Sequence, residues 1–151
     1  MTSEEAIVTE LTNKFHVLDG KTQVRRPRRI FSEVAYADFR PILDFAKDKL
    51  GFNYLNMITG LDEGDNLALY YHLSKNNAIT LNIKTFVTKN NPVVKTVTDV
   101  FPSADVAERE LVDLLGFKVE GLAAGSRYPL TDDWPVGEFP LRKDWKMKGE
   151  V

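Results

Sequence analysis

Few side chains in this sequence combine the type and the spacing that catalysis or metal binding requires. Asp132 and Asp133 are adjacent acids in a proline-rich stretch, where they could serve general acid–base chemistry or simply be solvated. His16 and His72 are the only histidines, and neither has a partner at ligand spacing. The acidic cluster at 62–65 lacks the spacing and the closing Glu of a calcium loop, so a hairpin turn is expected there.

The densest run of charge is Arg25-Arg26-Pro27-Arg28-Arg29. Four guanidinium groups in five positions could bind phosphates or an acidic protein, or they could form a solvated strand edge. The neighbouring sequence lacks the stacking aromatic residues of a single-strand binder. The chain also has a formal charge of −2, which gives no general attraction to nucleic acid or to an anionic membrane. A binding module that uses this run remains one alternative function.

Composition excludes several classes of protein and several kinds of site. The chain has 151 residues, of which 43% are hydrophobic, and this predicts one globular domain. It contains no cysteine, which excludes disulfides, thiolate metal sites and thiol nucleophiles from the chain. No glycine pattern of a phosphate-binding loop is present. We expect no signal peptide and no membrane span, because the acidic start and the lack of an apolar run of ~20 residues fit neither.

Apolar periodicity predicts an α+β fold, with an antiparallel sheet and helices packed on one face. Helices are expected from Ser3 to Phe15, from Asp38 to Leu50, from Asn91 to Phe101 and from Ala104 to Leu115, the last capped by Ser103 and closed by Gly116. Two short extended pieces should flank Pro27. Three consecutive strands are predicted at Asn53–Gly60, Leu67–Ser74 and Ala78–Thr88, separated by the 62–66 cluster and by Asn76-Asn77.

The helix predicted from Ala104 to Leu115 carries an informative set of charges. Its apolar stripe contains Ala107, Leu111, Leu114 and Leu115, whereas Glu108 and Arg109 fall outside that stripe. The simplest interpretation is an exposed charged face stabilised by local ion pairs. The alternative is that Glu108 and Arg109 hold the C-terminal residues, or another subunit, in place.

The last 35 residues have no period long enough to predict an element, so residues 1–116 are interpreted as an α+β domain and 117–151 as an irregular C-terminal interface segment. Both tryptophans of the chain, Trp134 and Trp145, lie in this segment. Large aromatic residues argue against disorder and are typical anchors of protein interfaces. Contact with a partner and wrapping around the chain's own domain are both possible.

A set of residues at positions 108–144 carries a family resemblance. Glu108-Arg109-Glu110 is followed by Asp113 and by Gly116, then by Arg127, then by Asp132 and Trp134, and finally by Pro140-Leu141-Arg142-Lys143-Asp144. The sequence resembles the 30 kDa subunit family of respiratory NADH dehydrogenase, also called complex I. It equally resembles the corresponding small subunit of membrane-bound, energy-converting nickel–iron hydrogenases. One departure stands out: where the family has Gly-His-Pro, this chain has Gly121-Leu122-Ala123, which favours a divergent branch, of the hydrogenase type or of another ancestral complex, over standard respiratory complex I.

The resemblance implies a subunit with no redox centre and no catalytic residues of its own. Such a subunit packs against the large hydrogenase-like subunit, beside a neighbouring iron–sulfur subunit. It lies in the peripheral arm on the cytoplasmic side, and contacts the membrane only through its partners. Iron–sulfur clusters, a nickel–iron centre or quinone would then belong to those partners.

Within this interpretation, the expected interface residues are those of the motif. Arg142, Lys143 and Asp144 are expected to make charge-assisted contacts, and Trp134 and Trp145 to act as hydrophobic anchors. The rival function is a stand-alone enzyme that uses Asp132, Asp133 and Arg127 in a cleft.

Overall fold

The computed structural model describes residues 1–76 and 78–149. Its helices and strands, in chain order, are α1 (Ser3–Lys14), the 3₁₀ helix η1 (His16–Leu18), β1 (Thr22–Arg26), β2 (Arg29–Glu33), α2 (Tyr36–Asp48), β3 (Tyr54–Asp62), β4 (Asn66–Ser74), β5 (Thr80–Thr88), β6 (Val93–Lys95), α3 (Ala104–Leu115) and β7 (Lys118–Glu120). The predicted α+β class is confirmed. Asn77, in the second predicted turn, lies outside the described residues.

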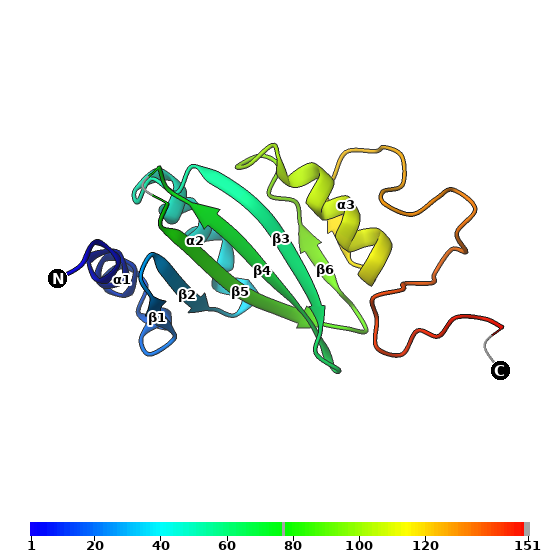
Figure 1. Ribbon diagram of the computed structural model, residues 1–151, viewed down its shortest axis with the longest axis horizontal. Coiled ribbons are helices and arrows are strands. Elements are labelled where there is room, and N and C mark those ends of the chain that lie inside the picture. The colour runs from blue at the N-terminus through cyan, green and yellow to red at the C-terminus, as the bar shows by residue number, and fades with distance from the viewer. Residues whose placement is uncertain (77, 150–151) are drawn as a thin grey trace. The chain divides into compact units, whose positions relative to one another are not determined.

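Five strands form the main sheet, in the order β1-β2-β5-β4-β3. Figure 1 shows β3, β4 and β5 side by side with arrows that alternate in direction, as their short connections predict. The sheet is nevertheless mixed rather than purely antiparallel, because β2 pairs with β5 in parallel. This pair could not be predicted from neighbouring turns, since α2 and the hairpin of β3 and β4 separate its two strands along the chain.

The chain divides into two compact units whose boundaries fall within β3, β4 and β5. The first unit contains Met1–Thr59 and Leu69–Phe86. Its core lies between α2 and the inward sides of the strands. Phe39 of α2 packs on Tyr71 of β4 with ring centroids 4.4 Å apart, and Phe45 meets Phe15 edge-on at 5.5 Å. Aromatic pairs at these distances add to the stabilisation that burial provides.

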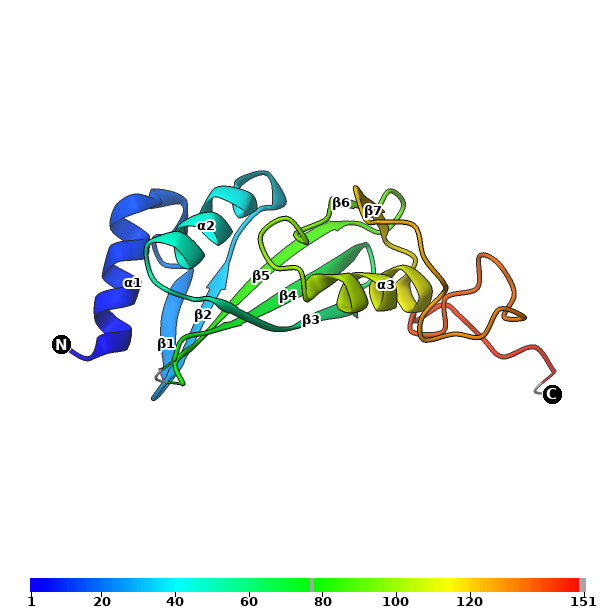
Figure 2. The same cartoon turned by 90° about the horizontal axis from the view of Figure 1, so that it is seen from above.

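The second unit contains Gly60–Ala68 and Val87–Val151, and it holds the residues of the family motif. Leu111 and Leu115 of α3 pack over Gly60 of β3, where an added Cβ would come within 2.4 Å of the Leu115 side chain. A side chain at position 60 would therefore displace α3. Strands β6 and β7 form a small parallel pair beside this helix. Figure 2 shows the irregular segment (orange to red) leaving β7 and passing the C-terminal end of α3.

One predicted element is wrong, and one was missed: β7 lies within the range from residue 117 onward that was expected to be irregular. Asn91–Phe101 does not form a helix; it begins with β6, and Val94 pairs with Val119 of β7. Pro92 suits the first turn of a helix, but the residues after it are largely β-branched, and their restricted side chains favour an extended backbone. In contrast, α3 has the predicted bounds, and Gly116 ends it with φ of +76° in the left-handed region.

Smaller differences concern helix starts. Thr2, not Ser3, caps α1 and forms a reciprocal capping box with Glu5. Helix α2 begins at Tyr36 rather than Asp38, and Ser103 gives α3 no side-chain cap. Among the described residues, none of the helices has the length and apolar character that a membrane span requires.

Candidate protein interface of the C-terminal segment

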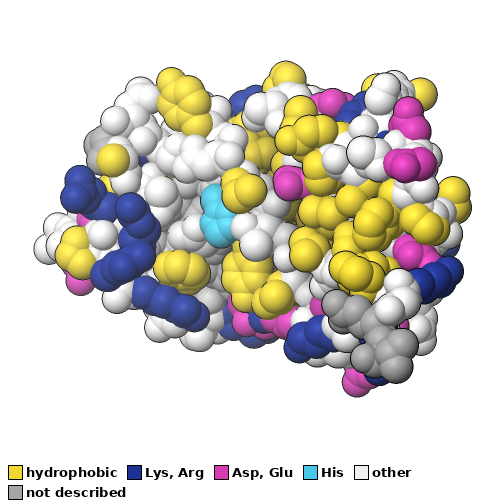
Figure 3. All heavy atoms as spheres, turned by 45° about the vertical axis from the view of Figure 1, so that its right-hand side comes forward, with side chains coloured by type: hydrophobic (Ala, Val, Ile, Leu, Met, Phe, Trp, Pro, Cys, Tyr) yellow, Lys and Arg dark blue, Asp and Glu magenta, His cyan; other side chains and the backbone are white. Residues whose placement is uncertain are grey.

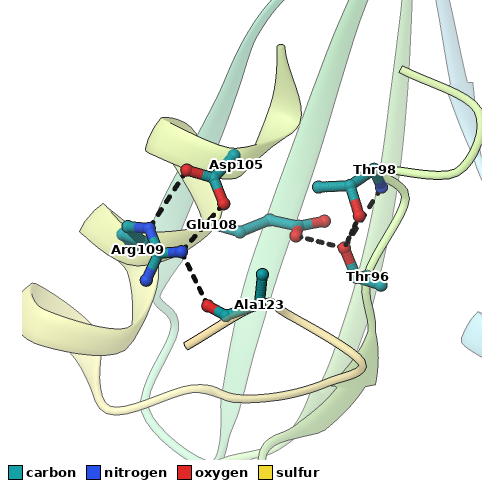
Figure 4. Close-up of polar contacts among 6 residues, drawn as sticks. All are labelled: Thr96, Thr98, Asp105, Glu108, Arg109 and Ala123. Atoms are coloured by element: carbon teal, nitrogen blue, oxygen red, sulfur yellow. Dashed lines mark hydrogen bonds and ion pairs between the residues drawn. The ribbon is translucent and has the colours of Figure 1, made fainter. Parts of the chain in front are cut away.

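Glu108 is buried rather than exposed, which corrects the expectation of an outer charged face. Its carboxylate accepts a hydrogen bond from the Thr96 hydroxyl at 2.6 Å and another from the Val97 backbone N–H at 2.7 Å. Figure 4 shows the side chain pointing from α3 toward the chain that follows β6. Burial raises the pKa of Glu108, although both hydrogen bonds oppose that shift. Glu108 therefore ties α3 to the segment after β6.

Arg109 holds the beginning of the C-terminal segment, defined here as residues 121–149. Its guanidinium makes two hydrogen bonds of 3.0 Å to Asp105, one turn earlier on α3. The same group donates to the carbonyl oxygen of Ala123 at 2.6 Å (Figure 4). At Gly125 a Cβ would come within 2.9 Å of this guanidinium, so the backbone approaches closely only because glycine is present. The alternative in which Arg109 holds the C-terminal residues thus agrees with these contacts.

Asp113 organises the middle of the C-terminal segment. It is largely buried, and its two carboxylate oxygens accept from Arg127 Nε at 3.4 Å and from the Leu130 backbone N–H at 3.1 Å. Arg127 also donates to the carbonyl oxygen of Trp134 at 2.7 Å. One buried acid on α3 and one arginine therefore fix the path of the loop that leads to Trp134.

The Pro140–Asp144 motif closes the end of α3. Arg142 Nε donates to the carbonyl oxygen of Leu115 at 2.6 Å, and the Leu141 N–H donates to that of Leu114 at 3.0 Å. The last carbonyl groups of a helix have no partner within the helix, and here the motif supplies partners. A Cβ on Gly116 would lie 2.5 Å from the ring of Phe139, so the contact also requires glycine.

The C-terminal segment is also attached near the turn between β3 and β4. Asp62, almost fully buried, accepts from Lys89 Nζ at 2.7 Å, from the Lys143 N–H at 2.9 Å and from the Gly64 N–H at 2.9 Å. Lys89 also pairs with Asp144 at 3.3 Å. Burial by itself would raise the pKa of Asp62, but the bonds from Lys89, Lys143 and Gly64 outweigh it and lower the pKa to about 2. Lys89 was not singled out in the sequence, since a lone lysine in a loop gives no signal.

The two tryptophans pack against each other, with ring centroids 5.8 Å apart, and both are half-buried. The indole N–H of Trp134 donates to the carbonyl oxygen of Glu138 at 2.8 Å. Other apolar side chains of the segment remain exposed, at 48% to 95%: Tyr128, Val136, Leu141 and Met147. Figure 3 shows hydrophobic side chains (yellow) gathered on the side of Figure 1 where this segment lies.

The residues of the rival enzyme are not arranged for catalysis. Arg127 is engaged by Asp113 and by a backbone carbonyl, whereas Asp132 is exposed, and Asp133 accepts a hydrogen bond from Thr131. The hydrogen bond from Thr131 lowers the pKa of Asp133, which suits a local turn contact rather than a proton-transferring acid. Within residues 1–76 and 78–149, no three His, Asp or Glu side chains converge as metal ligands would.

Comparison with known proteins places these contacts in a family context. The family model described as the 30 kDa subunit of respiratory-chain NADH dehydrogenase matches residues 32–151. The chain belongs to this family. The resemblance carried by the motif between Glu108 and Asp144 is therefore confirmed.

Similar proteins include subunits of a dehydrogenase, of an NADH-quinone oxidoreductase and, in Pyrococcus furiosus, of a membrane-bound hydrogenase, the last being 25% identical over 152 residues and covering 97% of this chain and 88% of that one. The chain is 29% identical over 143 residues to a subunit of the F420H2 dehydrogenase of Methanosarcina mazei, covering 93% of this chain and 90% of that one. It is 36% identical over 107 residues to a subunit of the NADH-quinone oxidoreductase of Moorella thermoacetica, covering 69% and 71%. Among solved structures, a chain of the membrane-bound sulfane sulfur reductase, an archaeal respiratory membrane complex, matches with a TM-score of 0.86 and 28% identity, covering 97% of this chain and 88% of that chain.

Proposed function

We propose that this chain is an accessory subunit, without a cofactor of its own, in the peripheral arm of a membrane-bound oxidoreductase complex. Its partners would be the large hydrogenase-like subunit and a neighbouring iron–sulfur subunit. Iron–sulfur clusters, a nickel–iron centre or quinone would reside in those partners. The complex would be of the quinone-reducing or the energy-converting hydrogenase type, as the names of its relatives suggest.

One observation carries this proposal. Three residues of the family motif make hydrogen bonds inside the second unit. Arg109, Asp113 and Arg142 attach the C-terminal segment to α3. That arrangement leaves Val136 and Leu141 exposed, at 95% and 56%. A long irregular segment fastened by its own charged groups, with exposed apolar side chains, has the properties expected of a preorganised protein interface.

The proposal also specifies how the chain reaches the membrane. It would lie on the cytoplasmic face and be attached through partner subunits. Expressed without those subunits, the chain should fractionate away from membranes; in the complete host it should sediment with them. Strong binding of the isolated chain to anionic liposomes would contradict indirect attachment.

The direct test is cross-linking in the host. A photoactivatable residue at Val136 or Leu141 should capture the large subunit of the complex that copurifies with the tagged chain. The matched control places the photoactivatable residue at Val17, an exposed valine of the first unit. It should not capture the peptides of the large subunit that are captured from Val136 or Leu141. If the tagged chain emerges from solubilised membranes without stoichiometric partners, it is not an accessory subunit.

A further inference from the structure

The outer face of the sheet in the first unit contains a hollow of about 400 Å³ that the proposed function does not use. The strand register shows which side chains share this face. Gln23 of β1 lies beside Phe31 of β2, and Glu33 of β2 lies beside Lys84 of β5. These side chains line the hollow together with Arg25. The hollow is therefore built from several strands and does not depend on a single loop.

Cations outnumber acids in this lining, since it contains Lys21, Arg25 and Lys84 but one acid, Glu33. The rim is also held in place, because the backbone N–H of Glu33 donates to the carbonyl oxygen of Lys21 at 3.1 Å. The chain as a whole has a formal charge of −2, so the excess of positive charge is local to this hollow.

Two of the cations rest on aromatic rings. Arg25 lies over Phe31, with Cζ 4.5 Å from the ring centroid, and Lys84 lies over Tyr70 at 5.6 Å. A guanidinium that lies over a ring is positioned by that ring, while the N–H donors at its edge can still bind a carboxylate. A carboxylate that binds Arg25 would therefore meet a charged donor whose position is already restricted, which reduces the entropy lost on binding.

The arginines at positions 25–29 make different contacts. Arg25 contributes to the hollow, whereas Arg29 donates to the carbonyl oxygens of Arg28 and Ala78 at 3.0 and 3.4 Å. Arg28 turns the chain with φ of +63°, and its backbone N–H donates to Glu4 at 2.6 Å. The run is thus not a uniform basic surface of the kind that follows a phosphate backbone or a membrane.

We propose that this hollow is a docking site for an acidic segment of a partner protein, which places Asp or Glu carboxylates on Arg25 and Lys21. Separate carboxylates on a flexible chain can reach these two cations and avoid Glu33. A continuous anionic surface could not avoid that acid. The proposal rests on the proposed function only in that the acidic segment would belong to another subunit of the same complex.

The first test uses the purified full-length chain and a fluorescein-labelled peptide of alternating Glu and Gly, followed by fluorescence anisotropy at low ionic strength. The peptide should bind, and Arg25→Ala should weaken binding by about fivefold. Arg26→Ala, which removes the same charge from the next residue outside the hollow, should weaken binding by less than about twofold, through long-range attraction alone. Glu33→Gln should strengthen binding by about threefold, because it removes the one acid that opposes the peptide.

Several outcomes would overturn the proposal. They are no binding of the peptide, equal losses in Arg25→Ala and Arg26→Ala, or weaker binding in Glu33→Gln. Phosphatidylserine vesicles provide a further arm: if they bind the chain with the same dependence on Arg25 and the peptide does not, the surface recognises a membrane instead.

A second test uses the assembled complex. A photoactivatable residue at Gln23 should capture a segment rich in Asp and Glu from another subunit, and capture of lipid or of no protein would overturn the proposal. The peptide assay needs no other protein of the complex. Failure of peptide binding with normal copurification therefore refutes the docking site alone, whereas normal peptide binding without copurification refutes the proposed function alone.

Discussion

Arg142 Nε donates a hydrogen bond to the carbonyl oxygen of Leu115, the last residue of α3, across 2.6 Å. The arginine of the Pro140–Asp144 motif therefore binds its own helix. Lys143 and Asp144 also contact residues of the same chain, Asp62 at the end of β3 and Lys89 after β5. Wrapping of the segment around its own unit and contact with a partner are compatible, because the charged residues fix the segment while its exposed apolar residues remain available.

Stability should depend on pH through Asp62. Its folded pKa of about 2 lies below its ordinary value of 3.8, so the ionised acid stabilises the fold above pH 4 and this contribution is lost as the pH falls toward 2. The loss should be about 2 kcal/mol. Urea unfolding between pH 5 and 2 measures it. Asp62→Asn should be less stable at pH 6 and should show a flatter decline; an unchanged slope would mean that Asp62 is not the group responsible.

The fold should tolerate Glu108→Gln but not Glu108→Ala. Glu108→Gln keeps an acceptor for the Val97 N–H and can still bond to Thr96, and it removes a carboxylate whose pKa burial has raised. It should therefore match the wild type near neutral pH. Glu108→Ala leaves the Val97 N–H unpaired and should lower the free energy of unfolding by about 1–3 kcal/mol. Equal losses in both variants, measured by thermal unfolding, would show that the carboxylate charge itself is required.

Substitutions at Gly116 and Gly137 test whether the Pro140–Asp144 motif packs on the end of α3. Both have positive φ, +76° and +82°, but a Cβ at Gly116 meets Phe139 and Arg142, whereas a Cβ at Gly137 meets nothing within 4 Å. Gly137→Ala should cost about 1 kcal/mol, which is the backbone strain alone. Gly116→Ala should cost at least about 2 kcal/mol, since the motif must also move. Equal costs in denaturant titrations would show that Phe139 and Arg142 do not rest on the end of the helix.

Much of this architecture could be predicted from the sequence, because local signals agreed with the fold. The apolar stripe and Gly116 predicted α3 with the observed bounds, and the turn-rich clusters predicted the order of β3, β4 and β5. The burial of Glu108 could not be predicted, because its partners Thr96 and Val97 directly follow β6. The position of Pro92 predicts a helix in place of that strand.

The contacts of the C-terminal segment were beyond sequence reasoning for another reason. Arg142 pairs with a residue 27 positions earlier, and Lys143 with one 81 positions earlier, and no periodicity records such separations. The family motif indicated which residues were candidates for an interface. Only the geometry showed that Asp113, Arg127 and Arg142 act within the chain.

The most direct test of the account is the affinity of the chain for the large subunit of its complex, measured with thermal unfolding of the same variant. Val136→Asp with Leu141→Asp places charge on the exposed side of the segment. It removes no hydrogen bond to α3, because Leu141 bonds to Leu114 through its backbone N–H. It should weaken binding about thirtyfold and leave the melting temperature unchanged. The control, Val17→Asp in the first unit, should bind normally. Wild-type affinity in the double variant, or a loss that merely follows unfolding, would contradict the claim that this segment is the interface.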